Sequence, residues 1–215
     1  MPLVLGVDGV TLASFATAGA TLVLAVATFA SVRSGNRSAR LAEQSLLAGL
    51  WPVLTTARPE DPDQKVMFVD DHKLVVPGGG AAAEATDDAI YLAIAVRNVG
   101  PGLAVLDRWW LAPERLGGDR GHAEPSDFHR LTRDLYIPPG EFGFWQGTFR
   151  EPGDPEFVRA ATAIRDRTAI TVDLLYGDHL GAERTVTRFV MLPRPDDRWY
   201  ATVSRHWNLD RPDPR

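Results

Sequence analysis

The segment that determines the fold class is Ile90–Val99, with the sequence IYLAIAVRNV. Alternate residues divide it into two faces: Ile90, Leu92, Ile94 and Val96 on one, and Tyr91, Ala93, Ala95 and Arg97 on the other. This period of two is the signature of a β-strand. Gly100-Pro101-Gly102 follows at once. The segment therefore predicts a strand that ends in a tight turn.

Similar short segments lie on both sides, separated by turns rich in glycine and proline. The expected strands are Val53–Thr56, Val66–Val69, Leu74–Val76, Leu103–Leu111, Leu131–Ile137, Phe142–Phe149, Ile170–Tyr176, Arg184–Met191 and Trp199–Trp207. Pro77–Asp88, with its triple glycine, and Gly117–Ser126 are expected to be loops. Many short strands predict a mainly β protein, an antiparallel β-sandwich.

One short helix interrupts the strands. Asp154-Pro155 has the residue types that cap and begin a helix, so a helix is expected near residues 154–165. Its inner face should carry four apolar residues, namely Phe157, Val158, Ala161 and Ile164.

The turns also carry a family resemblance. The order Ala93–Gly100 with Ala104, then Ile137-Pro138-Pro139-Gly140-Glu141, then Tyr176-Gly177-Asp178 resembles bacterial immunoglobulin-like domains related to cell-adhesion modules. It covers roughly Ile90–Met191 and implies an immunoglobulin-like β-sandwich. The whole chain resembles bacterial single-pass membrane proteins of unassigned activity that carry such a domain. The long Leu111–His129 loop and the 154–165 helix depart from the simplest pattern.

The chain begins with an apolar segment. Gly9–Val32, GVTLASFATAGATLVLAVATFASV, holds no charged residue. A helix of this length is about 36 Å long, and a bilayer core is about 30 Å thick. A cleaved signal peptide and a buried core helix are the alternatives. The possible cleavage motif Ala25-Val26-Ala27 lies inside the run, and the polar residues are too few for a solvated stripe. We therefore expect a transmembrane helix over residues 9–32.

The flanking charges predict an orientation. Arg33, Arg37 and Arg40 follow the apolar run, and no lysine or arginine precedes it. The positive-inside rule then places the N-terminus outside and the β-domain in the cytoplasm, at a bacterial plasma membrane. Residues 33–50 are expected to form a juxtamembrane helix, with Gly35-Asn36 as a candidate break and Trp51-Pro52 as its end. The expected parts are thus residues 1–32, 33–50 and 51–215.

Composition limits the partners. Three of the 23 lysines and arginines and two of the 28 acidic residues lie in the first 50 residues, so residues 51–215 hold 20 basic and 26 acidic residues. An acidic domain is a poor match for nucleic-acid phosphates, and no nucleic-acid partner is expected. The chain has no cysteine, which excludes disulfides and thiolate metal sites.

No residue set specifies a reaction. Ser126-Asp127-Phe128-His129 holds three catalytic residue types as near neighbours, which is not how a triad is built. Asp70-Asp71-His72 and Asp178-His179 could supply metal ligands, but both lie at expected hairpin tips, where these residues are common. Gly78-Gly79-Gly80 is not followed by Lys-Ser/Thr. We therefore expect no catalytic, cofactor or metal site.

Tryptophan is the more informative residue type. Trp109 and Trp110 are adjacent in an expected strand, so their side chains should point to opposite faces. Alternation groups Trp109 with Leu103, Val105, Asp107 and Leu111, and Trp110 with Ala104, Leu106 and Arg108. We expect Trp109 in the core, and Trp110 with Arg108 on an interaction surface. The alternative is that the 112–129 loop or the 154–165 helix covers the outward tryptophan.

The expected function is a non-enzymatic, membrane-anchored interaction or scaffold module that binds a protein partner. The alternatives are a small-ligand or carbohydrate-binding domain with exposed tryptophans, and an enzyme with an unrecognised site. The bilayer itself is the other expected partner. A row of mostly small residues in the span could also bring two copies together. That row is Ala13, Thr17, Ala20, Leu24, Ala27 and Ser31.

Overall fold

The structure of the protein is a computed structural model that describes residues 9–181 and 183–210. Within the first helix it leaves the side chains of residues 9–12, 43, 44 and 46–48 undescribed. The chain divides after Ala48 into two compact units, the second of which begins at Gly49. Each unit is described by itself.

The first unit contains one long helix, α1 (Gly9–Ala48). Its 40 residues correspond to about 60 Å. The stretch Ala13–Ala42 is long and apolar enough to cross a membrane, and all its side chains are exposed. The N-terminal region is therefore an apolar helix of the kind that serves as a membrane anchor or a signal sequence.

The helix does not break at Gly35-Asn36, where the sequence suggested a candidate break, and the expected segments 9–32 and 33–50 form one element. A glycine inside a helix costs only about 1 kcal/mol, which good helix formers on both sides can offset. The helix ends at Ala48, three residues before Trp51-Pro52.

The second unit is mainly β. Its strands are β1 (Leu54–Thr56), β2 (Gln64–Met67), β3 (Lys73–Val76), β4 (Gly80–Ala85), β5 (Ile90–Asn98), β6 (Ala104–Ala112), β7 (His129–Ile137), β8 (Phe142–Phe149), β9 (Ile170–Gly177), β10 (Arg184–Pro193) and β11 (Trp199–Asn208). All pairings between them are antiparallel. A 3₁₀ turn, Pro125–Asp127, and the helix α2 (Pro155–Arg165) complete it.

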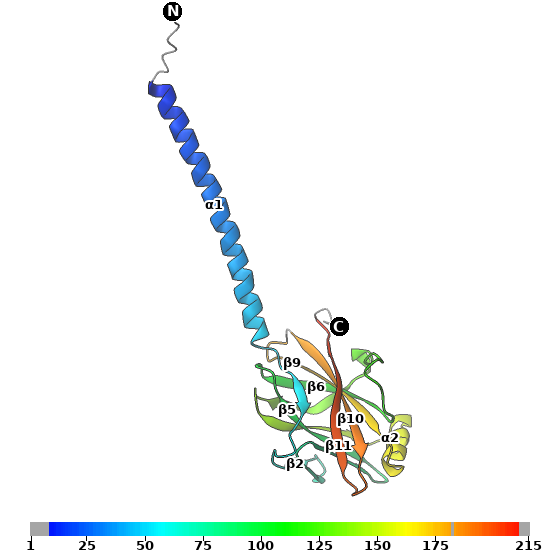
Figure 1. Cartoon of the computed structure of the whole chain (residues 1–215). Coiled ribbons are helices and arrows are strands. Elements are labelled where there is room, and N and C mark those ends of the chain that lie inside the picture. The colour runs from blue at the N-terminus through cyan, green and yellow to red at the C-terminus, as the bar shows by residue number, and fades with distance from the viewer. Residues whose placement is uncertain (1–8, 182, 211–215) are drawn as a thin grey trace, which may run out of the picture. The chain divides into compact units, whose positions relative to one another are not determined.

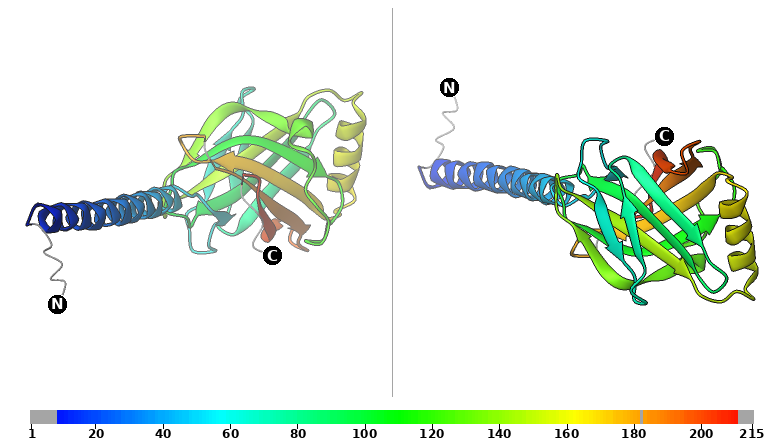
Figure 2. Two further views of the ribbon diagram at one scale, coloured as in Figure 1. Left: turned by 90° about the horizontal axis from the view of Figure 1, so that it is seen from above. Right: turned by 90° about the horizontal axis from the view of Figure 1, so that it is seen from below.

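In the part of the chain that the structure describes, nine strands form one continuous sheet, and β2 and β3 form a separate hairpin. β8 pairs with one edge of β5, while β4 and β1 pair with successive parts of its other edge. The order then continues through β11, β10, β9 and β6 to β7. The sheet curls into a half-barrel, where two packed sheets were expected (Figures 1 and 2). The mainly antiparallel β class is confirmed, but a clear sandwich is not seen.

The concave side of the sheet holds the largest core. Its members alternate along the strands, for example Ile90, Leu92 and Ile94 of β5 with Val172 and Leu174 of β9. Helix α2 packs its apolar side against this core. The Asp154 side chain caps it by accepting a hydrogen bond from the backbone N–H of Glu156 at 2.7 Å.

The inner face of α2 differs from the expected one at one position. Phe157, Ala161 and Ile164 are buried, but Val158 is 51% exposed, and Ala160 takes its place. The i, i+3, i+4, i+7 spacing from Phe157 explains this, since Val158 lies about 100° further round the helix.

The convex side of the sheet is covered in two places. The β2–β3 hairpin packs on β5, so that Tyr91, Ala93 and Ala95 are buried as well as the opposite face of that strand. The loop 113–128 packs on β9, β10 and β11 through Phe128 and Ala123. Strands β5, β9 and β10 are therefore buried on both faces along most of their length.

The segment Pro77–Asp88, expected to be a loop, contains strand β4. Ala81–Ala85 pairs with Ile94–Ile90 of β5, and Gly80 and Ala81 pair with β11. Alanine has a low intrinsic strand propensity, so no local pattern predicts a strand here. The small side chains fit because β4 contacts both α2 and the hairpin strand β3.

The end of β5 is organised by Asn98, which is fully buried. Its Nδ2 donates to the carbonyls of Gly102 at 2.6 Å and Ile137 at 2.9 Å. Its Oδ1 accepts from the N–H of Gly100 at 3.0 Å and of Val53 at 3.2 Å. The backbone of Leu50 passes directly over Gly102. A Cβ at this position would lie 1.7 Å from the Leu50 carbonyl oxygen, so only glycine fits.

Replacing Asn98 by alanine should lower the free energy of unfolding by at least about 2 kcal/mol, because it removes four hydrogen bonds to backbone groups, three of which are buried. Tryptophan fluorescence of the full chain in detergent reports this, because all six tryptophans lie after residue 50. Asn208→Ala is the matched control, at a half-buried asparagine of β11, and should cost less than about 1 kcal/mol. Equal losses in the two variants would show that the Asn98 network does not hold this end together.

Candidate interaction face

The two adjacent tryptophans lie on opposite faces, as the sequence predicted. Trp109 is 3% exposed and belongs to the concave core, whereas Trp110 is half-buried on the convex side. The expected grouping of their neighbours was wrong. A bulge at Asp107 shifts the register, so Ala104 and Leu106 share the inner side with Trp109. An extra residue in a strand reverses the alternation beyond it.

Trp109 lies where the two ends of the curled sheet meet. Its ring is 5.4 Å from that of Trp145 in β8, 5.1 Å from Phe149 and 4.9 Å from His129 in β7. At Gly147 a Cβ would lie 2.7 Å from the Trp145 ring and 3.1 Å from the Trp109 ring. Only a glycine therefore lets the two indoles pack against β8 at this position.

Trp110 is covered in part by the loop 113–128, which was the alternative considered for the outward tryptophan. The loop is fixed by Arg188, which is fully buried and pairs with fully buried Asp173 through Nε at 2.8 Å and Nη2 at 2.7 Å. Its remaining donors reach the carbonyl oxygens of Gly117, Arg120 and Gly121 at 2.8–3.1 Å. All five N–H donors of the guanidinium are thus used.

The Asp173–Arg188 pair is costly to bury but fully hydrogen-bonded. Burial raises the pKa of Asp173, and the Arg188 guanidinium opposes that shift. Removing one partner from such a pair leaves an uncompensated charge, which is strongly destabilising. The pair therefore fixes the position of the loop, and with it the half-buried position of Trp110.

Arg108 lies on the convex side of β6, the face on which the sequence placed it. It is half-buried, and its Nε is 3.3 Å from a carboxylate oxygen of Asp107. Directly opposite in the strand pairing is Arg130 of β7, which is exposed. Within residues 9–181 and 183–210, the side chain of Arg130 makes no hydrogen bond or ion pair. Two arginines thus face each other across neighbouring strands.

Beyond Arg130 the two end strands of the sheet approach without a backbone ladder. Their only described hydrogen bond runs from Nη2 of Arg133 in β7 to Oε1 of Gln146 in β8, at 2.9 Å. A pocket of about 220 Å³ opens between the strands, lined by residues 129–132, residues 146–148 and Trp109. We call this region, from residues 129–134 of β7 to residues 146–148 of β8, the seam. Sequence reasoning missed it, because strand order is not encoded locally.

The suggested chemical motifs take structural roles. Nε2 of His129 lies 2.9 Å from the Glu156 carboxylate in α2, whereas Ser126 contacts Asp127. Oδ1 of Asp178 accepts a hydrogen bond from the N–H of Leu180 within its turn, and His179 is exposed. Among the described residues, no group of three or more His, Asp or Glu side chains is arranged to hold a metal ion.

Asp70 holds the β2–β3 hairpin on the sheet. Its carboxylate accepts hydrogen bonds from the Tyr91 hydroxyl and, at 2.9 Å, from Arg150. Those bonds hold the pKa of Asp70 well below its usual range, and the same contact raises the pKa of Tyr91. His72 stacks on the Tyr91 ring at 3.8 Å and contacts Glu84 at 3.0 Å. Hydrogen bonds thus fix the tip to the sheet, while Asp70 and Asp71 themselves are exposed.

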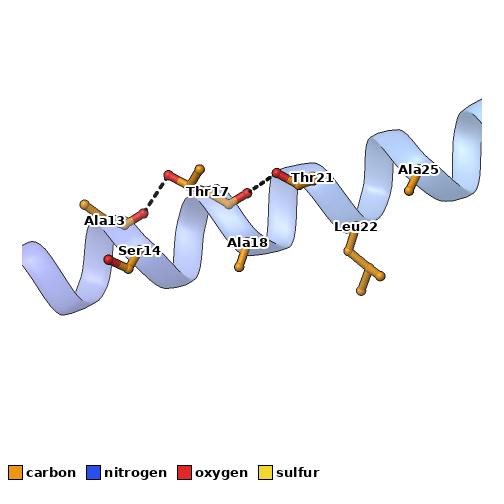
Figure 3. A pocket seen from close by; sticks show the side chains of 7 residues that line it. All are labelled: Ala13, Ser14, Thr17, Ala18, Thr21, Leu22 and Ala25. Carbon is orange, nitrogen blue, oxygen red and sulfur yellow. Dashed lines mark hydrogen bonds between the residues drawn. The ribbon is translucent and has the colours of Figure 1, made fainter.

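A strip of mostly small side chains runs along α1 near its N-terminal end, and Figure 3 shows the residues that form it. The hydroxyls of Thr17 and Thr21 donate to carbonyls one turn earlier, those of Ala13 and Thr17, both at 2.9 Å. The strip shares Ala13 and Thr17 with the expected row of small residues, then follows Thr21 and Ala25. The other members of that row, Ala20, Leu24, Ala27 and Ser31, do not line it.

Comparison with known proteins identifies no family for this chain. No family model matches the chain, and no curated protein matches it. Two solved structures of a β-glucosidase from Kluyveromyces marxianus, one selenomethionine-labelled and one with glucose, each align with 65% of this chain at 12% identity. The chain spans 15% of their length, and the TM-scores are 0.20. A likeness this weak assigns neither fold nor activity.

The two tryptophans should respond differently to truncation. Trp109→Ala should cost about 3–5 kcal/mol of unfolding free energy, since it empties a large site in the core. Trp110→Ala, on the half-buried face, should cost clearly less. Chemical denaturation of the full chain in detergent, followed by the fluorescence of the remaining tryptophans, measures both. Equal losses would mean that the loop makes Trp110 as much a core residue as Trp109.

Proposed function

We propose that the protein is a membrane-anchored, non-enzymatic binding module, in which α1 holds the chain in a bilayer and the β-domain binds another protein. The convex surface of β6 and β7 next to the seam, with Arg108 and Trp110, is the proposed contact surface. The observation that carries this proposal is the open seam. The sheet ends there without backbone pairing between β7 and β8, beside two opposed arginines.

The alternative of a carbohydrate-binding domain requires exposed aromatic rings. Four of the six tryptophans are buried, namely Trp109, Trp145, Trp199 and Trp207. The other two, Trp51 and Trp110, are half-buried. This distribution favours a protein contact, in which partly buried aromatic groups are common.

We also propose that the anchor is uncleaved and that the β-domain lies in the cytoplasm. The uncharged stretch 9–32 exceeds the length of a signal-peptide core, which supports an uncleaved anchor. The three arginines after it support a cytoplasmic β-domain. An immunoglobulin-like origin rests on the turn motifs, and pairing of two copies through α1 rests on the row of small residues.

The anchor is tested by fractionation. The full chain should pellet with membranes after a carbonate wash, because the apolar surface of α1 is stable only in a bilayer or detergent. A chain that begins at Gly49 should remain in the supernatant with folded tryptophan fluorescence. A full chain that stays soluble without detergent would contradict the anchor.

The binding surface is tested by cross-linking in cells from a photoreactive residue at position 108. It should give a discrete protein adduct from intact membranes. The control carries the photoreactive residue in place of Leu180, which is 63% exposed in the β9–β10 turn, and this variant should give no such adduct. No adduct at position 108, or the same adduct at both positions, would contradict the proposed surface.

The orientation is tested with single cysteines, which the natural chain lacks. Ser126 and Ser204 are both exposed, so Ser126→Cys and Ser204→Cys should be tolerated. In intact cells neither thiol should react with an impermeant maleimide, and both should react after lysis. Rapid labelling of both in intact cells would place the β-domain outside.

A further inference from the structure

The backbone edges of β7 and β8 define the seam. Among the strands that the structure describes, β7 pairs only with β6, and β8 pairs only with β5. The pairing of β7 is itself interrupted: Leu106 faces Leu135 and Arg108 faces Arg130, so β7 has three more residues than β6 in this interval. Unpaired N–H and C=O groups on a strand edge accept an added strand.

The pocket in the seam is small. Its volume of about 220 Å³ is below the roughly 300–1,000 Å³ of typical small-molecule sites. It suits one side chain of a longer ligand better than a whole cofactor or drug-sized molecule. Its walls supply hydrogen-bonding groups from Thr132, Gln146 and Thr148, and its inner end is Trp109.

Among the described residues, no carboxylate pairs with Arg130 or Arg133 at the pocket, whereas Arg108 lies beside the Asp107 carboxylate. Arg130 lines the pocket and is exposed, and Arg108 lies opposite it on β6. Arg133 donates to a neutral amide, that of Gln146, and its guanidinium lies 5.5 Å from the centre of the Phe144 ring. Like charges on opposed strand positions repel each other, and an anion between them relieves this.

We propose that the seam binds an extended, acidic segment of the partner protein. The segment adds a strand along the free edge of β8, and an Asp or Glu side chain enters the pocket and pairs with Arg130. This inference rests on the proposed function and deepens it, since it states the chemistry of the partner. The free edge supplies the backbone recognition, and Arg130, which has no carboxylate partner among the described residues, supplies the charge complementarity.

The test presents random twelve-residue peptides, displayed on phage, to the full chain in detergent and in parallel to Arg130→Ala. Peptides retained by the natural chain alone should carry Asp or Glu in a segment of strand-forming residues. One such peptide, synthesised, should bind Arg130→Ala about tenfold or more weakly, as expected for a lost charge-assisted hydrogen bond. Binding should recover in part in Arg130→Lys.

Two controls separate recognition from misfolding. Arg115→Ala changes an exposed arginine in the loop 113–128 and should bind like the natural chain. Tryptophan fluorescence melts should show Arg130→Ala to be as stable as the natural chain. Hydrogen exchange with the peptide bound should slow at amides of residues 142–149, as strand addition requires.

Each contrary result overturns the inference. It fails if no retained peptide depends on Arg130, if dependent peptides lack acidic residues, or if the β8 amides exchange unchanged. It also fails if Arg130→Ala changes only the self-association of the chain in sedimentation, because the seam would then join two copies. An adduct from position 108 without an Arg130-dependent peptide would retain the binding module and reject strand addition.

Discussion

The β-domain depends on how the two ends of its curled sheet are brought together. Trp109 from β6 and Trp145 from β8 pack edge to face at 5.4 Å inside the curl. Gly147 leaves room for both rings. This contact joins the two ends through side chains, where a closed barrel would have a backbone ladder. The end strands are thus held close while their backbone edges stay unpaired.

The convex side of the sheet is stabilised by a different kind of interaction. Apolar contacts bury the hairpin and the loop 113–128, but polar side chains fix their positions. Arg188 with Asp173 holds the loop, and Asp70 with Tyr91 and Arg150 holds the hairpin tip. Such networks add little net stability compared with apolar packing, yet they select one geometry, because each buried donor must keep its acceptor.

These two features bear directly on the proposed function. A closed barrel has no free edge, whereas this half-barrel keeps two of them beside an exposed arginine. The loop 113–128, held in place by Arg188, covers part of Trp110. The convex face of β6 therefore presents a partly buried aromatic ring next to Arg108. That combination of apolar area and guanidinium groups is typical of protein contact surfaces. The proposed role of α1 as an anchor would place this binding at a membrane.

Much of the architecture follows from the sequence. The uncharged run 9–32 specifies an apolar helix because its length and composition are sufficient by themselves. Period-two segments such as Ile90–Val99 specify strands, and Asp154-Pro155 specifies the start of α2. The burial of Trp109 was also predicted, although the alternation used for it was invalidated by the bulge at Asp107.

Only the tertiary structure decided the rest. Strand β4 forms from an alanine-rich segment without strand propensity, because β5 and β11 supply its hydrogen-bond partners. The single curled sheet, the meeting of β7 with β8 and the opposition of Arg108 to Arg130 all depend on pairings between distant residues. Local sequence patterns determine which residues form strands and which side of each strand is apolar. Strand order and register are instead set by how all the strands pack together, since only the assembled core distinguishes one arrangement from another.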